Sequence, residues 1–219
     1  MRINKYLAAA TDLSRRGADT AVFEGRVTIN GRAADSGSQV GEQDLVTLDG
    51  KPVFVDRALT TIMLNKPRGY VVSRHGQGAK TIYDLLPAEF RQLNPVGRLD
   101  KDSSGLLLLT NDGTLANELT HPRYAKVKIY EVRLNAPLAP LHQQMINDRG
   151  LSLEDGLSKL QLEKLDEQGY AWRVTMHEGR NRQIRRTFAA LDYTVRRLHR
   201  THFGPYALHD LSQGKIKII

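Results

Sequence analysis

Residues 97–113 read GRLDKDSSGLLLLTNDG, and this is the densest motif in the chain. Its first half is polar, with Asp100 flanked by Arg98 and Lys101, and its second half contains four consecutive leucines. A short apolar run that follows a glycine-containing polar turn is typical of a buried strand. The stretch therefore predicts an acidic turn that leads into a strand over residues 106–110.

Short strands and helices are expected on both sides of this stretch. Beyond residue 58 they lack the regular strand–helix–strand alternation of a parallel doubly wound sheet, so we expect an α+β fold. Apolar runs predict strands over residues 61–65, 70–73, 106–110, 128–134, 170–176, 193–203 and 215–219. Helical spacing predicts helices over residues 81–86, 112–119, 138–148 and 181–191.

The first fifty residues carry a pattern of their own. Residues 2–10 place apolar side chains on one helical face, and Ser14 can cap a second helix that ends at Glu24. The turn pair Asn30-Gly31 follows a short strand and is a strong signal for strand pairing, here between VTIN and the later LVTLDG. We therefore expect three parts: a module over 1–50, a linker over 51–57 and a larger domain over 58–219.

The composition limits the kinds of site that the chain can hold. It contains no cysteine, which excludes disulfides, thiolate metal sites and a cysteine nucleophile. No apolar run approaches the roughly 18 residues of a membrane span, and the N-terminal stretch does not read as a signal peptide. We therefore expect no membrane partner and a cytoplasmic location.

The charge is positive and unevenly distributed. There are 32 Lys and Arg against 24 Asp and Glu, a net charge of +8, which favours a polyanionic partner. Residues 178–200 contain seven arginines and two acidic residues, a local charge of +5. Arginine suits phosphate contacts and stacking on bases, although a solvated basic surface would give the same pattern.

Several common catalytic and metal motifs are absent or incomplete. Asp100, Asp102, Ser104 and Gly105 match the start of a calcium loop, but its twelfth position is Asn111 and the residues between form an apolar run. The chain has no phosphate-binding G-x-x-x-x-G-K-[ST] loop, no G-x-S-x-G elbow and no H-E-x-x-H pair. Its seven histidines show no zinc-type grouping.

What remains is an acidic turn in an arginine-rich chain. A carboxylate at the edge of a core, held ionised by a guanidinium, is suited to act as a nucleophile, and a structural salt bridge would look the same. The helix expected over residues 181–191 has Ile184 and Phe188 on one face. Its other face carries Arg182, Arg185 and Arg186.

Four segments together resemble the RsuA/RluB-type ribosomal RNA pseudouridine synthases. They are LNKPRGYVVS (64–73), residues 97–113, KIYEVRL (128–134) and EGRNRQIRR (178–186), in the order found in that family. RNRQIRR (180–186) and HRTHFGPY (199–206) are closer to the RluB-like, large-subunit branch. RINKYLA, SRR (14–16) and GRVTING (25–31) resemble a small RNA-binding module shared with a ribosomal protein of the small subunit.

The resemblance implies a role for each matched residue. Asp100 would be the catalytic carboxylate, attacking either the uracil ring or the ribose, and Arg98 would help hold the target base out of the RNA stack. Tyr130 would stack on the uracil and assist the late proton transfer, Arg185 would pair with Asp100, and Ile184 would line the pocket floor. Further substrate contacts would come from Arg182 and Arg186.

The resemblance also implies the architecture and the partners. It implies a two-helix RNA-binding module, contacting RNA through Arg2, Lys5, Arg15, Arg16 and Arg26, and a catalytic domain on a mixed, largely antiparallel sheet with flanking helices. The partner would be ribosomal RNA or a pre-ribosomal particle. We expect a monomer, and no cofactor or metal. Two alternatives are a non-catalytic ribosome-assembly factor and a metal-dependent nuclease that uses Asp100 and Asp102.

Overall fold

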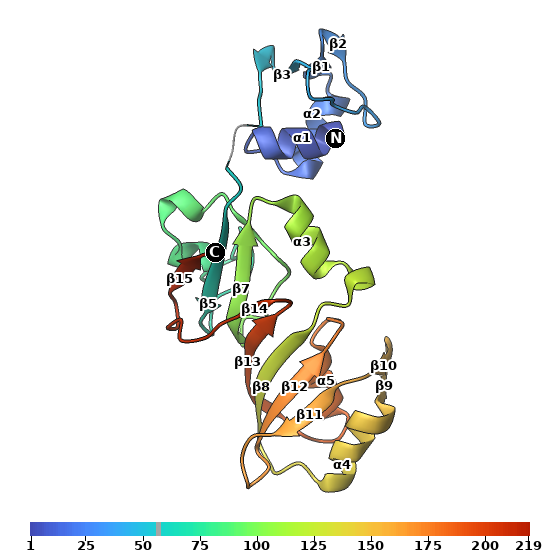
Figure 1. The fold of residues 1–219 in the computed structure, drawn as a ribbon, viewed down its shortest axis with the longest axis vertical. Coiled ribbons are helices and arrows are strands. Elements are labelled where there is room, and N and C mark those ends of the chain that lie inside the picture. The colour runs from blue at the N-terminus through green and yellow to red at the C-terminus, as the bar shows by residue number, and fades with distance from the viewer. Residues whose placement is uncertain (56–57) are drawn as a thin grey trace. The chain divides into compact units, whose positions relative to one another are not determined.

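The computed structural model describes residues 1–55 and 58–219, and the chain divides into two units, Met1–Leu59 and Thr60–Ile219 (Figure 1). The smaller unit begins with two helices. Ser14 caps the second of them, since its hydroxyl accepts a hydrogen bond from the Gly17 amide at 3.0 Å. The elements of this unit are α1 (Ile3–Ala10), α2 (Arg15–Phe23), β1 (Val27–Ile29), β2 (Arg32–Ala33), β3 (Val46–Leu48) and β4 (Lys51–Pro52).

The four strands of the smaller unit form an antiparallel sheet in the order β2-β1-β3-β4. The Asn30-Gly31 turn joins β1 to the short β2, so the expectation that it connects the two longer strands is wrong; β3 pairs with the other edge of β1. Lys51 and Pro52 form β4 where a linker was expected. Residues 56–57 of that linker lie outside the described residues.

The larger unit is built on one mixed sheet in which β11-β12-β8-β13-β7-β5-β15 lie side by side (Figure 1). Two short strands add to it, β14 beside β13 and β6 beside β7. β9 (Leu151–Leu153) and β10 (Gly156–Ser158) form a separate hairpin. The strands of the main sheet are β5 (Thr61–Lys66), β6 (Asn94–Pro95), β7 (Ser104–Thr110), β8 (Lys128–Leu134), β11 (Gln161–Lys164), β12 (Ala171–Met176), β13 (Val195–Phe203), β14 (Tyr206–Ala207) and β15 (Ile216–Ile218).

Several helices differ from the expected ranges. The helix expected over 138–148 is divided into α4 (Pro140–Gln144) and a π-helical turn, η4 (Met145–Arg149). The strand expected over 70–73 is reduced to a single bridge between Val71 and Thr81. The remaining helices are α3 (Gly113–Thr120), α5 (Gln183–Ala189) and the 3-10 turns η1 (Ile82–Leu85), η2 (Ala88–Phe90) and η3 (Pro122–Tyr124).

The centre of the main sheet is a parallel pair, β7 with β13, between otherwise antiparallel neighbours. Gly105 lies where the two strands meet, with φ of +108°, a conformation that favours glycine. A Cβ atom at this position would lie 2.2 Å from the Arg200 carbonyl oxygen. The glycine of the DSSGLLLL segment therefore allows the close approach that brings the Asp100 turn beside β13.

Buried side chains cover both faces of β7, whose seven residues are all buried. One face packs in a cluster with Trp172 and Phe188, and the other packs with Leu119 and Phe203. No helix in the described part of the chain is both long and apolar enough to cross a bilayer.

Candidate active site

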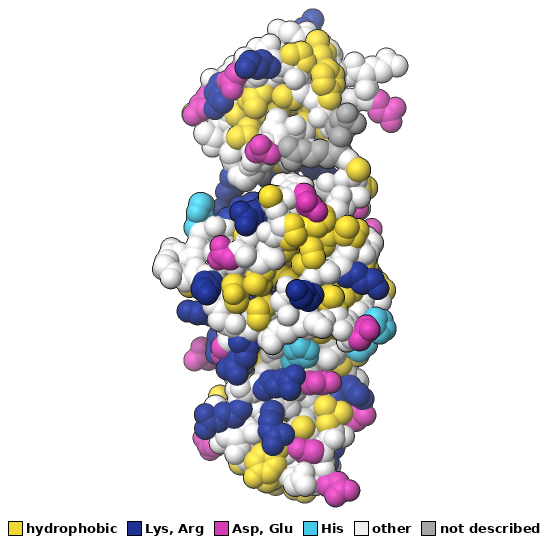
Figure 2. All heavy atoms as spheres, turned by 90° about the vertical axis from the view of Figure 1, so that its left-hand side faces the viewer, with side chains coloured by type: hydrophobic (Ala, Val, Ile, Leu, Met, Phe, Trp, Pro, Cys, Tyr) yellow, Lys and Arg dark blue, Asp and Glu magenta, His cyan; other side chains and the backbone are white. Residues whose placement is uncertain are grey.

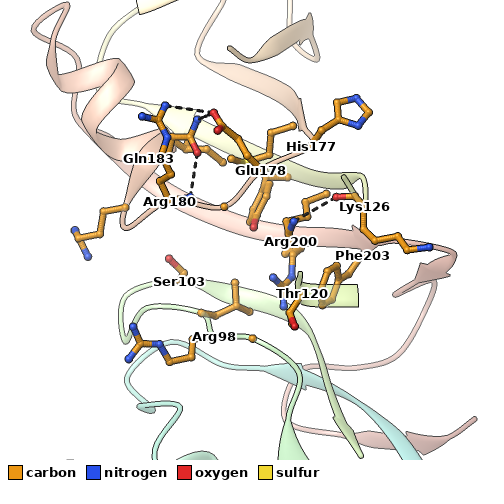
Figure 3. A pocket seen from close by; sticks show the side chains of 18 of the residues that line it. Arg98, Ser103, Thr120, Lys126, His177, Glu178, Arg180, Gln183, Arg200 and Phe203 are labelled. Atoms are coloured by element: carbon orange, nitrogen blue, oxygen red, sulfur yellow. Dashed lines mark hydrogen bonds and ion pairs between the residues drawn. The ribbon is translucent and has the colours of Figure 1, made fainter. Parts of the chain in front are cut away.

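A pocket of about 370 Å³ opens in the larger unit, between the turn that precedes β7 and the facing parts of β8, β13 and the start of α5 (Figure 3). Five of the residues singled out from the sequence line it: Arg98, Asp100, Tyr130, Arg182 and Ile184. Arg185 and Arg186 are not among the lining residues. The pocket is thus built from segments that are far apart in the sequence.

The Asp100 turn is held from below by Lys66, the last residue of β5. The Lys66 ammonium is fully buried and donates to three carbonyl oxygens, of Pro67 at 3.1 Å, of Asp100 at 3.1 Å and of Ser103 at 2.8 Å. Burial lowers the pKa of Lys66 to about 8, against the opposing effect of the nearby Asp100 and Asp102 carboxylates. The main chain of the turn is therefore fixed by a buried cation.

Arg182 contacts both carboxylates of the turn. Its Nη1 atom lies 3.3 Å from Asp100 Oδ2 and 3.3 Å from Asp102 Oδ1, and its Nη2 atom donates to Asp102 Oδ2 at 3.4 Å. About a third of the Asp100 side chain remains exposed, at 34%. Asp100 is therefore held by an arginine and still accessible from the pocket.

The expected pairing of Arg185 with Asp100 needs correction. Arg185 Nη2 lies 3.0 Å from Asp102 Oδ2 and 3.3 Å from the Asp102 carbonyl oxygen, while Nη1 donates to the Val195 carbonyl oxygen at 2.9 Å. The Arg185 side chain is only 12% exposed, and burial lowers its pKa. Arg185 thus joins the turn to β13, and Arg182 takes the place beside Asp100.

Asp102 is the more heavily bonded of the two carboxylates. Burial acts to raise its pKa, but the hydrogen bond from Arg182 and the charges of Arg185 and Arg182 together lower it. Its side chain binds Arg182, the N-cap of α5, and Arg185 within α5, and so joins this helix to the turn. These contacts suit Asp102 to a structural role and leave Asp100 as the less engaged carboxylate.

Tyr130 and Ile184 supply the apolar part of the pocket. Tyr130 lies in β8, between Arg200 of β13 and Val174 of β12, and is 8% exposed. The Tyr130 hydroxyl makes no hydrogen bond to any other described residue. Ile184, 4% exposed, comes from the first turn of α5. A flat aromatic ring beside an aliphatic side chain can hold a planar base.

Arg186 is held outside the pocket by a carboxylate of the β9–β10 turn. Arg186 Nη2 and Nη1 donate to Asp155 at 2.6 and 3.0 Å, and Arg180 donates to the same carboxylate at 2.8 Å. Gln183, which donates to Ser158 at 3.0 Å and to Glu178, extends this network. The expectation that Arg186 contacts substrate is therefore not supported by its place in the structure.

The arginine-rich segment is mostly engaged within the protein. Four of its seven arginines make ion pairs and Arg200 is buried, which leaves Arg196 and Arg197 exposed without an ion pair to a described residue. On the face drawn in Figure 2, Lys and Arg side chains are scattered among acidic and apolar ones. The local +5 is thus chiefly an internal network of the larger unit.

In the smaller unit, all five expected RNA-contacting residues are exposed: Arg2, Lys5, Arg15, Arg16 and Arg26. Arg26 differs because its guanidinium binds Asp49 at 2.7 Å and Glu24 at 3.1 Å. The hydrogen bond with Asp49 and then that with Glu24 raise the pKa of Arg26. The Arg26–Asp49 ion pair therefore joins the start of β1 to the end of β3.

The sequence analysis assigned no role at the site to Lys66 or Arg200, and it did not predict that Asp102 pairs with Arg185. Lys66 stands at the end of an apolar run, and it pairs in register with Gly105. That cross-strand position places its ammonium under the Asp100 turn. A lysine at the end of a buried strand was the available signal for it.

Comparison with known proteins accords with this geometry. Residues 60–190 match the RNA pseudouridylate synthase family, and residues 1–46 match the S4 domain. The chain belongs to the RNA pseudouridylate synthase family. The residues matched to this family contain the Asp100 turn, Tyr130 and α5.

Individual relatives of the family align over nearly the whole chain. An uncharacterized RNA pseudouridine synthase of Aquifex aeolicus is 39% identical, over 98% of this chain and 88% of its own length. The ribosomal large subunit pseudouridine synthase B of Bacillus subtilis is 36% identical, over 97% of this chain and 89% of its own. A crystal structure of a pseudouridylate synthase superposes with a TM-score of 0.72 at 30% identity, covering 100% of this chain and 96% of that one.

Proposed function

We propose that this pseudouridine synthase converts a uridine of large-subunit ribosomal RNA to pseudouridine, with Asp100 as its nucleophile. The observation that carries the proposal is the position of Asp100, a partly exposed carboxylate at a pocket, bound by Arg182, on a turn fixed by Lys66. The large-subunit target is supported by the name of the Bacillus subtilis relative.

The reaction breaks the bond from ribose C1′ to uracil N1, turns the ring and joins C1′ to uracil C5, which then loses its proton. It needs a nucleophile, a pocket that retains the free base, and a group that moves the proton. It consumes no water and transfers no electrons to another molecule. The residues named above provide these parts without a metal or cofactor.

The residues that line the pocket, and Arg185 behind them, then have separate tasks. Asp100 attacks the uracil ring or ribose C1′, and Arg182 keeps its carboxylate oriented. Tyr130 stacks on the uracil, and its unpaired hydroxyl can accept or pass on the C5 proton. Arg98, which makes no hydrogen bond or ion pair to another described residue, is free to occupy the space that the flipped base leaves. Arg185 acts through Asp102 as a positioning residue.

The S4 domain would bring the RNA to this site. Its exposed cations supply phosphate contacts, and the larger unit holds the reacting groups. We propose that the protein acts as a monomer on ribosomal RNA or an assembling ribosomal particle, in the cytoplasm, where ribosomes are made.

The test compares two neighbouring carboxylates in the same turn. Asp100→Asn preserves size and removes the nucleophile, so pseudouridine formation in large-subunit ribosomal RNA should fall by several orders of magnitude. Asp102→Asn, the matched control with the same arginine partner, should retain measurable turnover. RNA affinity and thermal unfolding should change little in Asp100→Asn.

Mass-spectrometric mapping of pseudouridine after reaction with purified protein gives the readout. More than a few per cent of wild-type turnover in Asp100→Asn would remove Asp100 from the role of nucleophile. RNA binding by the wild-type protein without any pseudouridine formation would favour the non-catalytic assembly factor instead.

A further inference from the structure

Arg200 places a buried, largely unpaired guanidinium at one end of the pocket. It belongs to β13, is 3% exposed, and lines the pocket together with Asp100. Only its Nε atom is bonded, to the Leu106 carbonyl oxygen at 2.8 Å. Its Nη2 atom is buried without a hydrogen-bond partner among the described residues. A guanidinium has five N–H donors, and here four of them have no acceptor among the described residues.

A second cation shares this end of the pocket. Among the described residues, Lys128, in β8, donates only to the carbonyl oxygen of Lys126, at 3.3 Å. Its ammonium lies 5.4 Å from the Phe203 ring centroid, and the Arg200 guanidinium carbon lies 4.6 Å from the same centroid. Figure 3 shows Arg200 next to Phe203, away from Gln183 and Arg180 at the other end of the view. We call Arg200 and Lys128 the cationic corner.

The cationic corner is electrostatically unfavourable without a ligand. Burial and the charge of Arg200 lower the pKa of Lys128, and only Glu178 acts in the opposite direction. Neither cation makes an ion pair with a described carboxylate. A buried charge without a partner is costly.

We propose that the cationic corner is a subsite for one phosphate of the RNA backbone, adjacent to the nucleotide whose base occupies the pocket. A phosphodiester carries a full negative charge and oxygens that accept from both a guanidinium and an ammonium. A uracil ring is neutral and would leave both positive charges uncompensated. The proposal rests on the proposed function, because it takes RNA as the substrate.

The position of the cationic corner in the same pocket as Asp100 suggests what the bound phosphate does. Asp100 and the cationic corner line the same pocket, so a phosphate bound by Arg200 belongs to the strand that delivers the reacting nucleotide. It would fix the sugar and backbone while the base is free to turn. Phosphate contacts position a nucleic acid without reading its sequence.

The first test removes one charge of the corner. Lys128→Met removes the charge and keeps most of the length of the side chain, and the same change at Lys217, an exposed lysine in β15, is the matched control. Binding of a transcript of large-subunit ribosomal RNA is measured at several KCl concentrations. Lys128→Met should make the negative slope of log K against log [KCl] less steep by about 0.7–0.9, the loss of one phosphate contact, and Lys217→Met should leave it unchanged.

Stability measurements separate a ligand site from a structural one. Because Lys128 and Arg200 repel each other, Lys128→Met should unfold at the same temperature as the wild type or a higher one. Arg200→Lys, which keeps the charge, should retain more of the salt slope than Arg200→Met. A fall in unfolding temperature for Lys128→Met with an unchanged salt slope would overturn the proposal.

Two further outcomes are distinguishable. If inorganic phosphate raises the unfolding temperature of the wild type but not of Lys128→Met, and the RNA salt slope is the same for both, the corner holds a free anion and the RNA assignment is wrong. If the wild type forms no pseudouridine, the proposed function fails. The slope difference between Lys128→Met and Lys217→Met still decides whether RNA phosphate binds here.

Discussion

Lys66 Nζ donates to the main-chain oxygen of Asp100 at 3.1 Å, across 34 residues of sequence. The contact joins the end of β5 to the turn before β7, and it is one of three that the same ammonium makes. Lys66 thus holds the main chain of Asp100, while its side chain contacts Arg182 and lines the pocket.

Replacing Lys66 should loosen this turn. Lys66→Met leaves three buried carbonyl oxygens without their donor, so the free energy of unfolding should fall by at least about 2 kcal/mol. The single-turnover rate should fall more than the RNA affinity, because the turn carries Asp100. Urea unfolding and single-turnover assays measure the two effects. Lys80→Met, at an exposed lysine, serves as control, and an equal loss in both proteins would argue against the role of Lys66.

The lowered pKa of Lys66 has a defined signature in stability. Its pKa falls from 10.5 to about 8 in the folded protein because of burial. Between these pH values the unfolded chain holds this proton and the folded chain does not, so the titration of Lys66 raises the free energy of unfolding as pH rises. The free energy of unfolding is measured for the wild type and for Lys66→Met from pH 7 to 10.5. The difference, wild type minus Lys66→Met, should become more positive as pH rises through this range. Parallel curves would contradict it.

Gly105 should tolerate no side chain. In Gly105→Ala the new Cβ would meet the Arg200 main chain at 2.2 Å, at a φ that alanine disfavours, so the protein should lose several kcal/mol of stability or fail to fold. Gly113→Ala is the control, because nothing lies within 4 Å of its Cβ and it begins α3. The control should change stability by less than about 1 kcal/mol. Thermal unfolding compares the two.

Substitutions of Arg182 and Arg185 should affect different properties, the catalytic rate and the stability respectively. Arg182→Gln removes the partner of Asp100 and should lower the single-turnover rate at least tenfold, with a small change in unfolding temperature. Arg185→Gln removes the bonds to Asp102 and Val195 and should lower the unfolding temperature clearly. Arg185→Lys should recover part of that loss, since charge returns without the planar fork. Identical profiles for both glutamine variants would contradict the separate roles.

The exposed cations of the S4 domain should contribute to the affinity of the protein for RNA. A Lys5→Gln, Arg15→Gln and Arg16→Gln triple variant should weaken RNA binding and flatten its salt dependence, while the rate at saturating RNA changes little. Arg26→Gln is the control, because its guanidinium is already bound to Asp49 and Glu24. It should alter stability more than the salt slope. A larger change of slope in Arg26→Gln would mean that those ion pairs open on RNA.

Local patterns predicted the elements of this fold better than their partners. The strand expected over residues 128–134 coincides with β8, where buried and exposed residues largely alternate, and Ser14 caps α2 as its residue type indicates. The strand expected over 70–73 is absent, because only Val71 finds a bridging neighbour. Strand formation there depended on a partner that the local sequence cannot specify.

The same limit applies to the candidate site. The family resemblance implied that Arg185 pairs with Asp100, but the choice between Arg182 and Arg185 depends on how α5 meets the turn. Arg182 adopts a left-handed conformation at the helix cap, with φ of +46°, which no helical pattern would suggest. Asp155, which binds Arg186, lies in a hairpin that the sequence analysis did not predict.

The parallel pairing of β7 with β13 also bears on how the enzyme is made. Ser104 and His199 are register partners, so the strand that follows Asp100 remains incomplete until a segment about 95 residues later has been synthesised. Contacts of such long range form late in folding, after the local hairpins and helices. The Asp100 turn therefore cannot reach Arg200 in the sheet until β13, about 95 residues further along the chain, has paired with β7.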